Sequence, residues 1–258
     1  MRREERLLQR LDEIGKILEM KGGAFMLLGL GSVGKEIERL DAYSDLDFFI
    51  IAKPGHKMRF IDQLDWLEAA YPLAYSFKNC DIGYKVMFHD GIYGEFAIFE
   101  EQELAHAAYS EGRIVWKDPS YENVGIVKSA VSSSRIKVVS LDHVFNEALT
   151  NLYVGLGRYA RGEKLSAVRF VEQYAIDSIL SALHVSEQEV DYYPDPFGND
   201  RRLEKRYPGF ANRIGQMMQG YDKIPESALH ILDFIEEIYP VNAKLSDEIR
   251  MLAKACRS

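Results

Sequence analysis

The sequence predicts an α+β protein in which an N-terminal domain with a mixed β-sheet is followed by a C-terminal helical bundle. Short apolar runs between Gly and Pro residues, which are typical of buried strands, occur in the first half of the chain. From Leu141 onward, long segments of helical periodicity replace them. A stretch of weaker pattern with Pro and Ser separates the two parts between Lys117 and Ser140. We therefore expect a catalytic domain over residues 1–125 and a helical substrate-binding domain over 126–258.

The N-terminal domain begins with a helix over residues 4–20, because apolar side chains recur there at helical spacing and Gly22 follows as a stop signal. The apolar run at 24–28 lies between glycines and predicts a buried strand. The same reasoning predicts a short helix or turn at 32–40, a strand at 47–51, an amphipathic helix at 60–70, and strands at 83–89 and 94–99. Asp90-Gly91 between the last two strands is a hairpin signal.

Five helices are predicted in the second half, over residues 141–161, 165–184, 208–221, 227–239 and 246–255. The loop 191–202 gathers aromatic and charged side chains around two prolines, and binding residues are often found on such loops. Tyr193 and Arg201 are our candidates for contact with an acceptor substrate. A plain interhelical loop is an equally good interpretation of the same residues.

Composition and charge favour some classes of protein and disfavour others. The chain is 47% hydrophobic and 28% charged, with a formal net charge of −8, which indicates a globular protein and disfavours a nucleic-acid-binding surface. An acidic surface suits a neutral or cationic small substrate. We see no signal peptide and no apolar run of membrane-spanning length. Cys80 and Cys256 are far apart and outside any metal-binding motif, which fits a reducing cytoplasm.

The informative motif is a Gly-Ser pair followed by an Asp-x-Asp pair. Gly31 and Ser32 end a predicted strand, where backbone N–H groups and a hydroxyl can approach a phosphate closely. Asp45 and Asp47 are two residues apart, so both carboxylates project from one face of a strand while Leu46 points into the core. Two carboxylates together with substrate phosphates are the ligands that Mg²⁺ prefers.

This order and spacing resembles the signature of nucleotidyltransferases of the DNA polymerase beta superfamily. With segments 43–50 and 86–96, the chain is similar to bacterial lincosamide and aminoglycoside nucleotidyltransferases over residues 25–105. The resemblance implies Mg²⁺-dependent transfer of a nucleoside monophosphate, AMP from ATP, to a hydroxyl of a small molecule, as in antibiotic resistance. Over the C-terminal half the resemblance is only architectural, so it does not identify the acceptor.

The resemblance also implies roles for individual residues. Glu95 matches the third carboxylate of these enzymes, so it is expected to act as the general base or as a third metal ligand. Its competitors for that role are Asp90, Glu100 and Glu101. Asp45 and Asp47 are the expected metal ligands and catalytic residues. The expected nucleotide-binding residues are Gly31, Ser32, Lys35, Asp45 and Asp47.

Two other functions stay open at this point. The chain could be a catalytically inactive or regulatory nucleotide-binding protein of the same fold, or a nucleotidyltransferase that acts on a protein. The expected partners are a nucleoside triphosphate and a small hydroxyl-bearing substrate bound between the domains, with neither nucleic acid nor membrane. Because the similar enzymes often pair, we also expect a homodimer.

Overall fold

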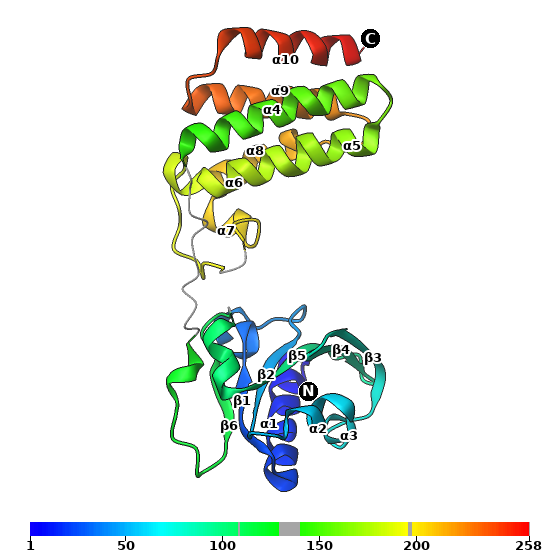
Figure 1. The fold of residues 1–258 in the computed structure, drawn as a ribbon, viewed down its shortest axis with the longest axis vertical. Helices are drawn as coiled ribbons and strands as arrows, with labels where there is room; N and C mark the ends of the chain where they lie inside the picture. The colour runs from blue at the N-terminus through cyan, green and yellow to red at the C-terminus, as the bar shows by residue number, and fades with distance from the viewer. Residues whose placement is uncertain (108, 129–139, 196–197, 258) are drawn as a thin grey trace. The chain divides into compact units, whose positions relative to one another are not determined.

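A computed structural model of the chain describes residues 1–107, 109–128, 140–195 and 198–257. The protein is α+β, as predicted, and divides into two compact units, residues 1–133 and 134–258 (Figure 1). This division falls C-terminal to the predicted boundary after residue 125. In the described part of the chain, no helix combines the length and apolar composition that a membrane span requires.

Unit 1 contains a mixed sheet of six strands in the order β3-β4-β5-β2-β1-β6. The strands are β1 (Ala24–Gly29), β2 (Leu46–Ala52), β3 (Leu73–Cys80), β4 (Gly83–Phe88), β5 (Tyr93–Glu100) and β6 (Arg113–Lys117). The two central strands β2 and β5 are parallel to each other, and every other neighbouring pair is antiparallel. Parallel pairing makes β2 and β5 begin at the same edge of the sheet.

The two edge strands were not predicted. Nearly every residue of β3 is exposed, so the strand lacks the alternation between buried and exposed side chains that identifies a strand from sequence. All five residues of β6 are half-buried, which gives no alternation either. Both strands exist because a neighbouring strand offers them a ladder of backbone hydrogen bonds.

Three helices cover one face of this sheet: α1 (Arg3–Lys21), α2 (Lys57–Asp62) and α3 (Asp65–Glu68). The predicted single helix at 60–70 is wrong, because the chain breaks at Gln63, which adopts extended backbone, and forms α2 and α3 instead. Leu11 of α1 and Trp66 of α3 are fully buried with Phe48 of the sheet. This layer is the main core of the unit.

The opposite face carries a smaller apolar cluster. It joins Leu28 and Ile51 of the sheet to Leu104 and Tyr109 from the segment that precedes β6. The described residues of the unit also form the 3-10 turns η1 (Gly31–Val33), η2 (Ile37–Arg39), η3 (Glu101–His106) and η4 (Gly125–Val127). On this face β2 and β5 contribute their later residues to the cluster, and the polar residues at their beginnings fall outside it.

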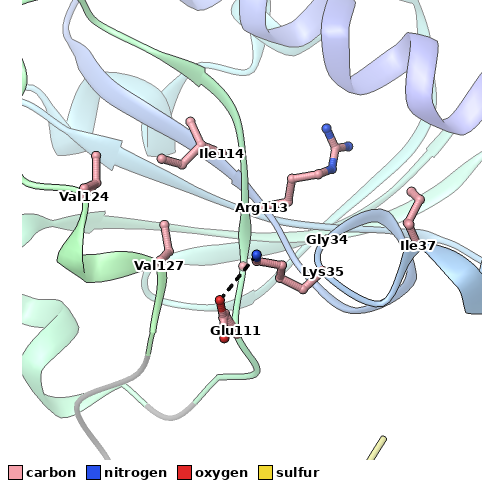
Figure 2. A pocket seen from close by; sticks show the side chains of 9 residues that line it. Gly34, Lys35, Ile37, Glu111, Arg113, Ile114, Val124 and Val127 are labelled. Atoms are coloured by element: carbon pink, nitrogen blue, oxygen red, sulfur yellow. Dashed lines mark ion pairs between the residues drawn. The ribbon is translucent and has the colours of Figure 1, made fainter.

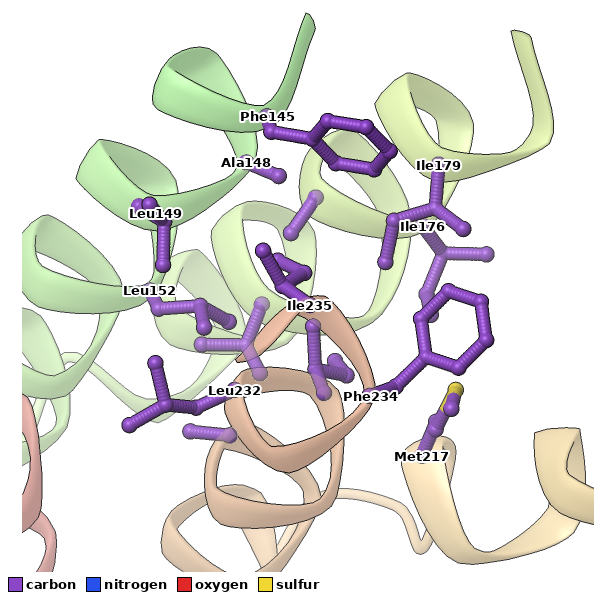
Figure 3. Packing of buried hydrophobic residues seen from close by; sticks show 14 of the residues in the cluster. Phe145, Ala148, Leu149, Leu152, Ile176, Ile179, Met217, Leu232, Phe234 and Ile235 are labelled. Carbon is purple, nitrogen blue, oxygen red and sulfur yellow. The ribbon is translucent and has the colours of Figure 1, made fainter. Parts of the chain in front are cut away.

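Unit 2 is helical, as predicted. Its elements are α4 (Leu141–Ala160), α5 (Lys164–Val168), the π-helical turn η5 (Arg169–Tyr174), α6 (Ala175–Ser186), α7 (Leu203–Arg206), α8 (Pro208–Met217), α9 (Ile224–Ile238) and α10 (Ala243–Cys256). Side chains from α4, α6, α8 and α9, among them Phe145, Ile179 and Phe234, interlock in one core (Figure 3). The predicted helix at 165–184 corresponds to α5, η5 and α6, with the π-turn interrupting the α-helical pattern.

Candidate active site

Asp47 and Glu95 lie side by side on the two parallel strands. The register of β2 and β5 pairs Asp47 with Glu95, so both side chains project from the same face of the sheet. Neighbouring strands are about 4.8 Å apart, a separation at which two carboxylates can share one ligand. Leu46 is fully buried on the opposite face, where it holds this part of β2 in place.

Asp45 lies next to the same pair of carboxylates. Leu46 pairs with Gly94, which places Asp45 alongside Tyr93 at the start of β5. Burial, a hydrogen bond to Glu95 and the charges of Glu95 and Asp45 together raise the pKa of Tyr93 to about 12. The charge of Asp45 thus reaches the phenol that is hydrogen-bonded to Glu95, so Asp45 and Glu95 both act on Tyr93.

The Asp45 and Asp47 carboxylates suit a metal ion that is also bound by the oxygens of a triphosphate substrate. Among the described residues, no group of three His, Cys, Asp or Glu side chains is arranged to enclose a metal by itself. Mg²⁺ needs only one or two carboxylates when triphosphate oxygens and water complete its shell. Asp45 and Asp47 fit that requirement, since hard carboxylate oxygens are their only functional atoms.

Glu95 is held by two polar partners. The hydroxyl of Tyr93 donates a hydrogen bond of 2.7 Å to its Oε1 atom. The ammonium group of Lys85, on the neighbouring strand β4, lies 3.0 Å from the same oxygen. The Glu95 side chain is still 38% exposed, so its carboxylate can be reached by a ligand on this face.

The Gly31–Ser32 turn follows β1 directly and lies beside Asp47. The N–H of Leu30 donates to the carbonyl oxygen of Asp47 at 2.7 Å, which fixes the turn against β2. Gly31 has a φ of 52°, in the left-handed region that glycine tolerates. The first N–H groups of a 3-10 turn have no partner inside the turn, so they can donate to an anion together with the Ser32 hydroxyl.

A pocket of about 470 Å³ lies next to this turn, between residues 34–37 and the segment around β6 (Figure 2). It is lined by Gly34, Lys35, Ile37, Glu111, Gly112, Arg113, Ile114, Val124 and Val127. The Nζ atom of Lys35 lies 3.6 Å from Oε1 of Glu111, and both side chains are well exposed. Such a pair contributes only about 0–1 kcal/mol, so a triphosphate could attract Lys35 away from Glu111.

The other candidate carboxylates lie elsewhere. Asp90, in the turn between β4 and β5, forms an ion pair of 3.0 Å with the buried Arg10 of α1. Glu100, at the far end of β5, accepts a hydrogen bond of 2.9 Å from the N–H of Gly55. Glu101 accepts one of 2.5 Å from the side-chain amide of Asn123. Of the four acidic residues considered for the third carboxylate, the fold brings Glu95 to Asp47.

The candidate acceptor loop belongs to unit 2. Tyr193 has a φ of 36°, a left-handed conformation that is unusual for a tyrosine. Arg201 lies 3.7 Å from the carboxylate of Asp195, whose side chain is 3% exposed. Pro196 and Phe197 lie outside the described residues. The role of Tyr193 and Arg201 stays a prediction.

Sequence reasoning missed Lys85 and Tyr93. Tyr93 stands two residues before Glu95, so the strand periodicity that placed Glu95 would also have placed Tyr93 on its face. Lys85 lay on a predicted strand, but its position opposite Glu95 depends on the hairpin register. The connection between β4 and β5 is longer than two residues, and loops of that kind do not fix the register from sequence.

Comparison with known proteins shows a similarity in structure but none in sequence. No family model matches the sequence, and no curated protein matches it. An aminoglycoside 6-adenyltransferase from Bacillus subtilis is similar in structure, with 15% sequence identity and a TM-score of 0.39. The alignment covers 100% of this chain and 99% of that one. The activity in its name is that of the Bacillus subtilis protein, and what this chain can do follows from its own side chains.

Proposed function

We propose that the chain is a nucleotidyltransferase that transfers a nucleoside monophosphate, with ATP as the expected donor, to a hydroxyl of a small molecule. One observation carries the proposal. Asp47 and Glu95 are paired in register on two parallel strands, with Asp45 beside them and the Gly31–Ser32 turn hydrogen-bonded to the same strand. The Gly31–Ser32 turn and the acidic side chains thereby lie near each other at one end of the sheet.

Nucleotidyl transfer needs mainly positioning and neutralisation of charge. Mg²⁺ bound by Asp45 and Asp47 would supply neutralisation of the triphosphate charge. The N–H groups of the turn, the Ser32 hydroxyl and the Lys35 ammonium would hold the phosphates that leave as pyrophosphate. Each of these groups is a hydrogen-bond donor, which matches the acceptor oxygens of a phosphate.

In this proposal Glu95 acts as the general base. The acceptor oxygen forms a bond to the α-phosphorus, the bond from that phosphorus to the bridging oxygen breaks, and pyrophosphate leaves. The proton of the attacking hydroxyl passes to the Glu95 carboxylate, whose orientation Tyr93 and Lys85 fix. A role of Glu95 as a third metal ligand is the alternative within the same proposal.

The first test is pyrophosphate release by the full-length protein with Mg²⁺, from each nucleoside triphosphate, across lincosamides, aminoglycosides and small polyols. We expect Asp45→Asn and Asp47→Asn to lower turnover roughly 10²- to 10³-fold, because each removes a charge that the triphosphate site requires. Asp62→Asn, an exposed aspartate on α2, is the matched control and should keep full turnover.

Near-normal turnover by both aspartate variants would contradict the proposal. Mg²⁺-dependent nucleotide binding without pyrophosphate release would instead identify a regulatory nucleotide-binding protein. Labelled nucleotide that appears on a protein band would identify a protein acceptor. Far-UV circular dichroism should stay unchanged in the Asp47 variant, because its side chain is exposed rather than part of the core.

The second test separates the two roles of Glu95. As a general base, Glu95 acts on the acceptor hydroxyl, so Glu95→Gln should lower kcat about 10²- to 10⁴-fold and leave triphosphate affinity unchanged. As a third metal ligand, it would also support triphosphate binding, which should then weaken in the variant. Single-turnover kinetics and nucleotide titration measure the two quantities separately. An unchanged rate would remove Glu95 from the site.

A further inference from the structure

The face that carries Asp47 and Glu95 continues across β4 and β3. Glu95 pairs with Lys85 of β4, and Lys85 pairs with Phe77 of β3. Directly paired residues on neighbouring strands project from the same face. One row of side chains therefore runs from Asp47 through Glu95 and Lys85 to Phe77.

A second row runs parallel to the first. Tyr93 pairs with Met87 of β4, and Met87 pairs with Tyr75 of β3. The side chains at the β3 and β4 end of the two rows are apolar and open to solvent: Tyr75 is 54% exposed, Phe77 51% and Met87 40%. We call these three residues the apolar platform.

The apolar platform differs from an ordinary edge of a sheet. Single exposed apolar residues are common on protein surfaces, but adjacent large ones mark sites of binding. Edge strands usually carry charges that discourage association. Here Tyr75 and Phe77 lie on the edge strand β3, on the one face that also holds the candidate catalytic carboxylates.

The distance from the platform to Glu95 indicates which part of an acceptor the platform would bind. Phe77 lies two strand positions from Glu95, which corresponds to about 10 Å. The Lys85 ammonium stands between Phe77 and Glu95, 3.0 Å from the Glu95 carboxylate. It offsets one of the three negative charges that Asp45, Asp47 and Glu95 bring to this region, so the charge of this face does not select against cationic acceptors.

We propose that the apolar platform binds the apolar part of the acceptor in the proposed transfer reaction. The acceptor is then a molecule whose reactive hydroxyl is about 10 Å or less from an aromatic ring or alkyl group. The inference rests on the proposed function, and it narrows the acceptor to hydroxyl compounds with an apolar substituent. Tyr75 and Phe77 are specificity residues, and Glu95 remains the residue that meets the hydroxyl.

The test uses two probes that share their hydroxyls and differ in the substituent, phenyl β-D-glucoside and methyl β-D-glucoside. Binding is measured calorimetrically on the full-length protein with Mg²⁺ and a non-hydrolysable ATP analogue. We expect the phenyl compound to bind about tenfold more tightly than the methyl compound, because one ring is buried. Phe77→Ala and Tyr75→Ala should abolish that difference.

Met58→Ala is the control, since Met58 is also 54% exposed but lies on α2, outside the platform. Equal affinity for the two glucosides, no binding of the phenyl compound, or full affinity in Phe77→Ala would each overturn the proposal. So would light scattering that shows Phe77→Ala converting a dimer to a monomer, because the platform would then be occupied by a second copy of the chain.

Asp47→Asn distinguishes this proposal from the proposed function. We expect it to lower pyrophosphate release with the phenyl glucoside roughly 10²- to 10³-fold while leaving binding of the glucoside intact. Phe77→Ala should raise KM with little change in kcat. If the binding pattern holds but the wild-type protein releases no pyrophosphate, the transferase assignment fails and the platform stands as a binding site. If pyrophosphate is released but Phe77→Ala changes neither affinity nor KM, only the platform fails.

Discussion

Tyr93 orients the Glu95 carboxylate through a hydrogen bond. Its phenol donates a hydrogen bond of 2.7 Å to Oε1, and its pKa is raised to about 12, mainly by burial and then by Glu95. The phenol therefore stays protonated, and remains a donor, throughout the physiological pH range. Lys85 binds the same oxygen, which leaves the second carboxylate oxygen as the one that can accept a proton from a substrate.

We expect Tyr93→Phe to lower turnover about tenfold, because Glu95 loses the donor that orients it. The folded-state pKa of about 12 lies above the ordinary value of 10.0, so the neutral phenol is the form that folding favours. Its contribution to stability is fully present below pH 10 and is lost as the pH rises through 12. The stability difference between wild type and Tyr93→Phe should therefore shrink over that window.

Urea unfolding at a series of pH values measures this difference. The phenolate absorbance of wild type minus Tyr93→Phe gives the titration of Tyr93 directly. Tyr43, which is 93% exposed, provides the control variant Tyr43→Phe, for which no such dependence is expected. A stability difference that is constant up to pH 12 would show that the Tyr93 phenol is not the titrating group.

The turn after β1 depends on a glycine that the motif does not include. A Cβ atom on Gly34 would lie 2.6 Å from the carbonyl oxygen of Gly29 and 2.7 Å from the carbonyl carbon of Leu30. Both contacts are to backbone, which cannot rotate away as a side chain can. Arg113 of β6 donates to the carbonyl of Val33 at 3.0 Å and holds the other side of the turn.

Gly34→Ala should therefore destabilise unit 1 by about 1–3 kcal/mol and displace the Gly31–Ser32 turn. Nucleotide affinity should fall more than this loss of stability alone explains, because the donors of the turn move. Urea unfolding followed by tryptophan fluorescence measures the stability, since Trp66 and Trp116 both belong to unit 1.

Gly215→Ala is the matched control on α8, where an added Cβ meets nothing within 4 Å. Alanine has the higher helix propensity, so this variant should be neutral or slightly more stable by circular dichroism. Its tryptophan transition should be unchanged. If Gly34→Ala has wild-type stability and nucleotide affinity, then the turn can accommodate the added Cβ without loss of either.

The whole chain is built around separate cores. The cluster that contains Phe145 and Leu232 draws its buried residues from unit 2, whereas those around Phe48 and Ile51 draw theirs from unit 1. Cooperative unfolding follows contiguous cores, so each unit should unfold in its own transition.

Because Trp66 and Trp116 report only on unit 1, the two transitions can be followed separately. Far-UV circular dichroism reports mainly on the helices, most of which are in unit 2. We expect the urea midpoints from the two signals to differ. Coincident midpoints, with Gly34→Ala moving both equally, would indicate a single cooperative molecule. The homodimer and the acceptor role of the Tyr193 loop stay predictions.

Local patterns in the sequence were sufficient for most elements. Short apolar runs bounded by Gly and Pro predicted the strands β1 and β2, and the segments 83–89 and 94–99 predicted β4 and β5. Helical periodicity predicted α1, α4, α6, α8, α9 and α10, because side-chain direction within an element depends only on its own backbone. The short helix α7 was not predicted. The two-residue spacing of Asp45 and Asp47 predicted that they share one face, at the beginning of β2. The β3 and β6 strands carry no such pattern and could not be predicted.

The pairing of strands β2, β5 and β4 determines which residues make up the candidate site. Glu95 reaches Asp47 because β5 is parallel to β2 in one particular register, and Lys85 reaches Glu95 through the register of β4. Asp90, an equal candidate in the sequence, is held instead by Arg10 of α1. A shift of one residue would turn each side chain to the other face, and that register is set by contacts between segments far apart in the chain. The sequence pattern therefore shows which residues can face a ligand, and only the folded sheet determines which of them meet.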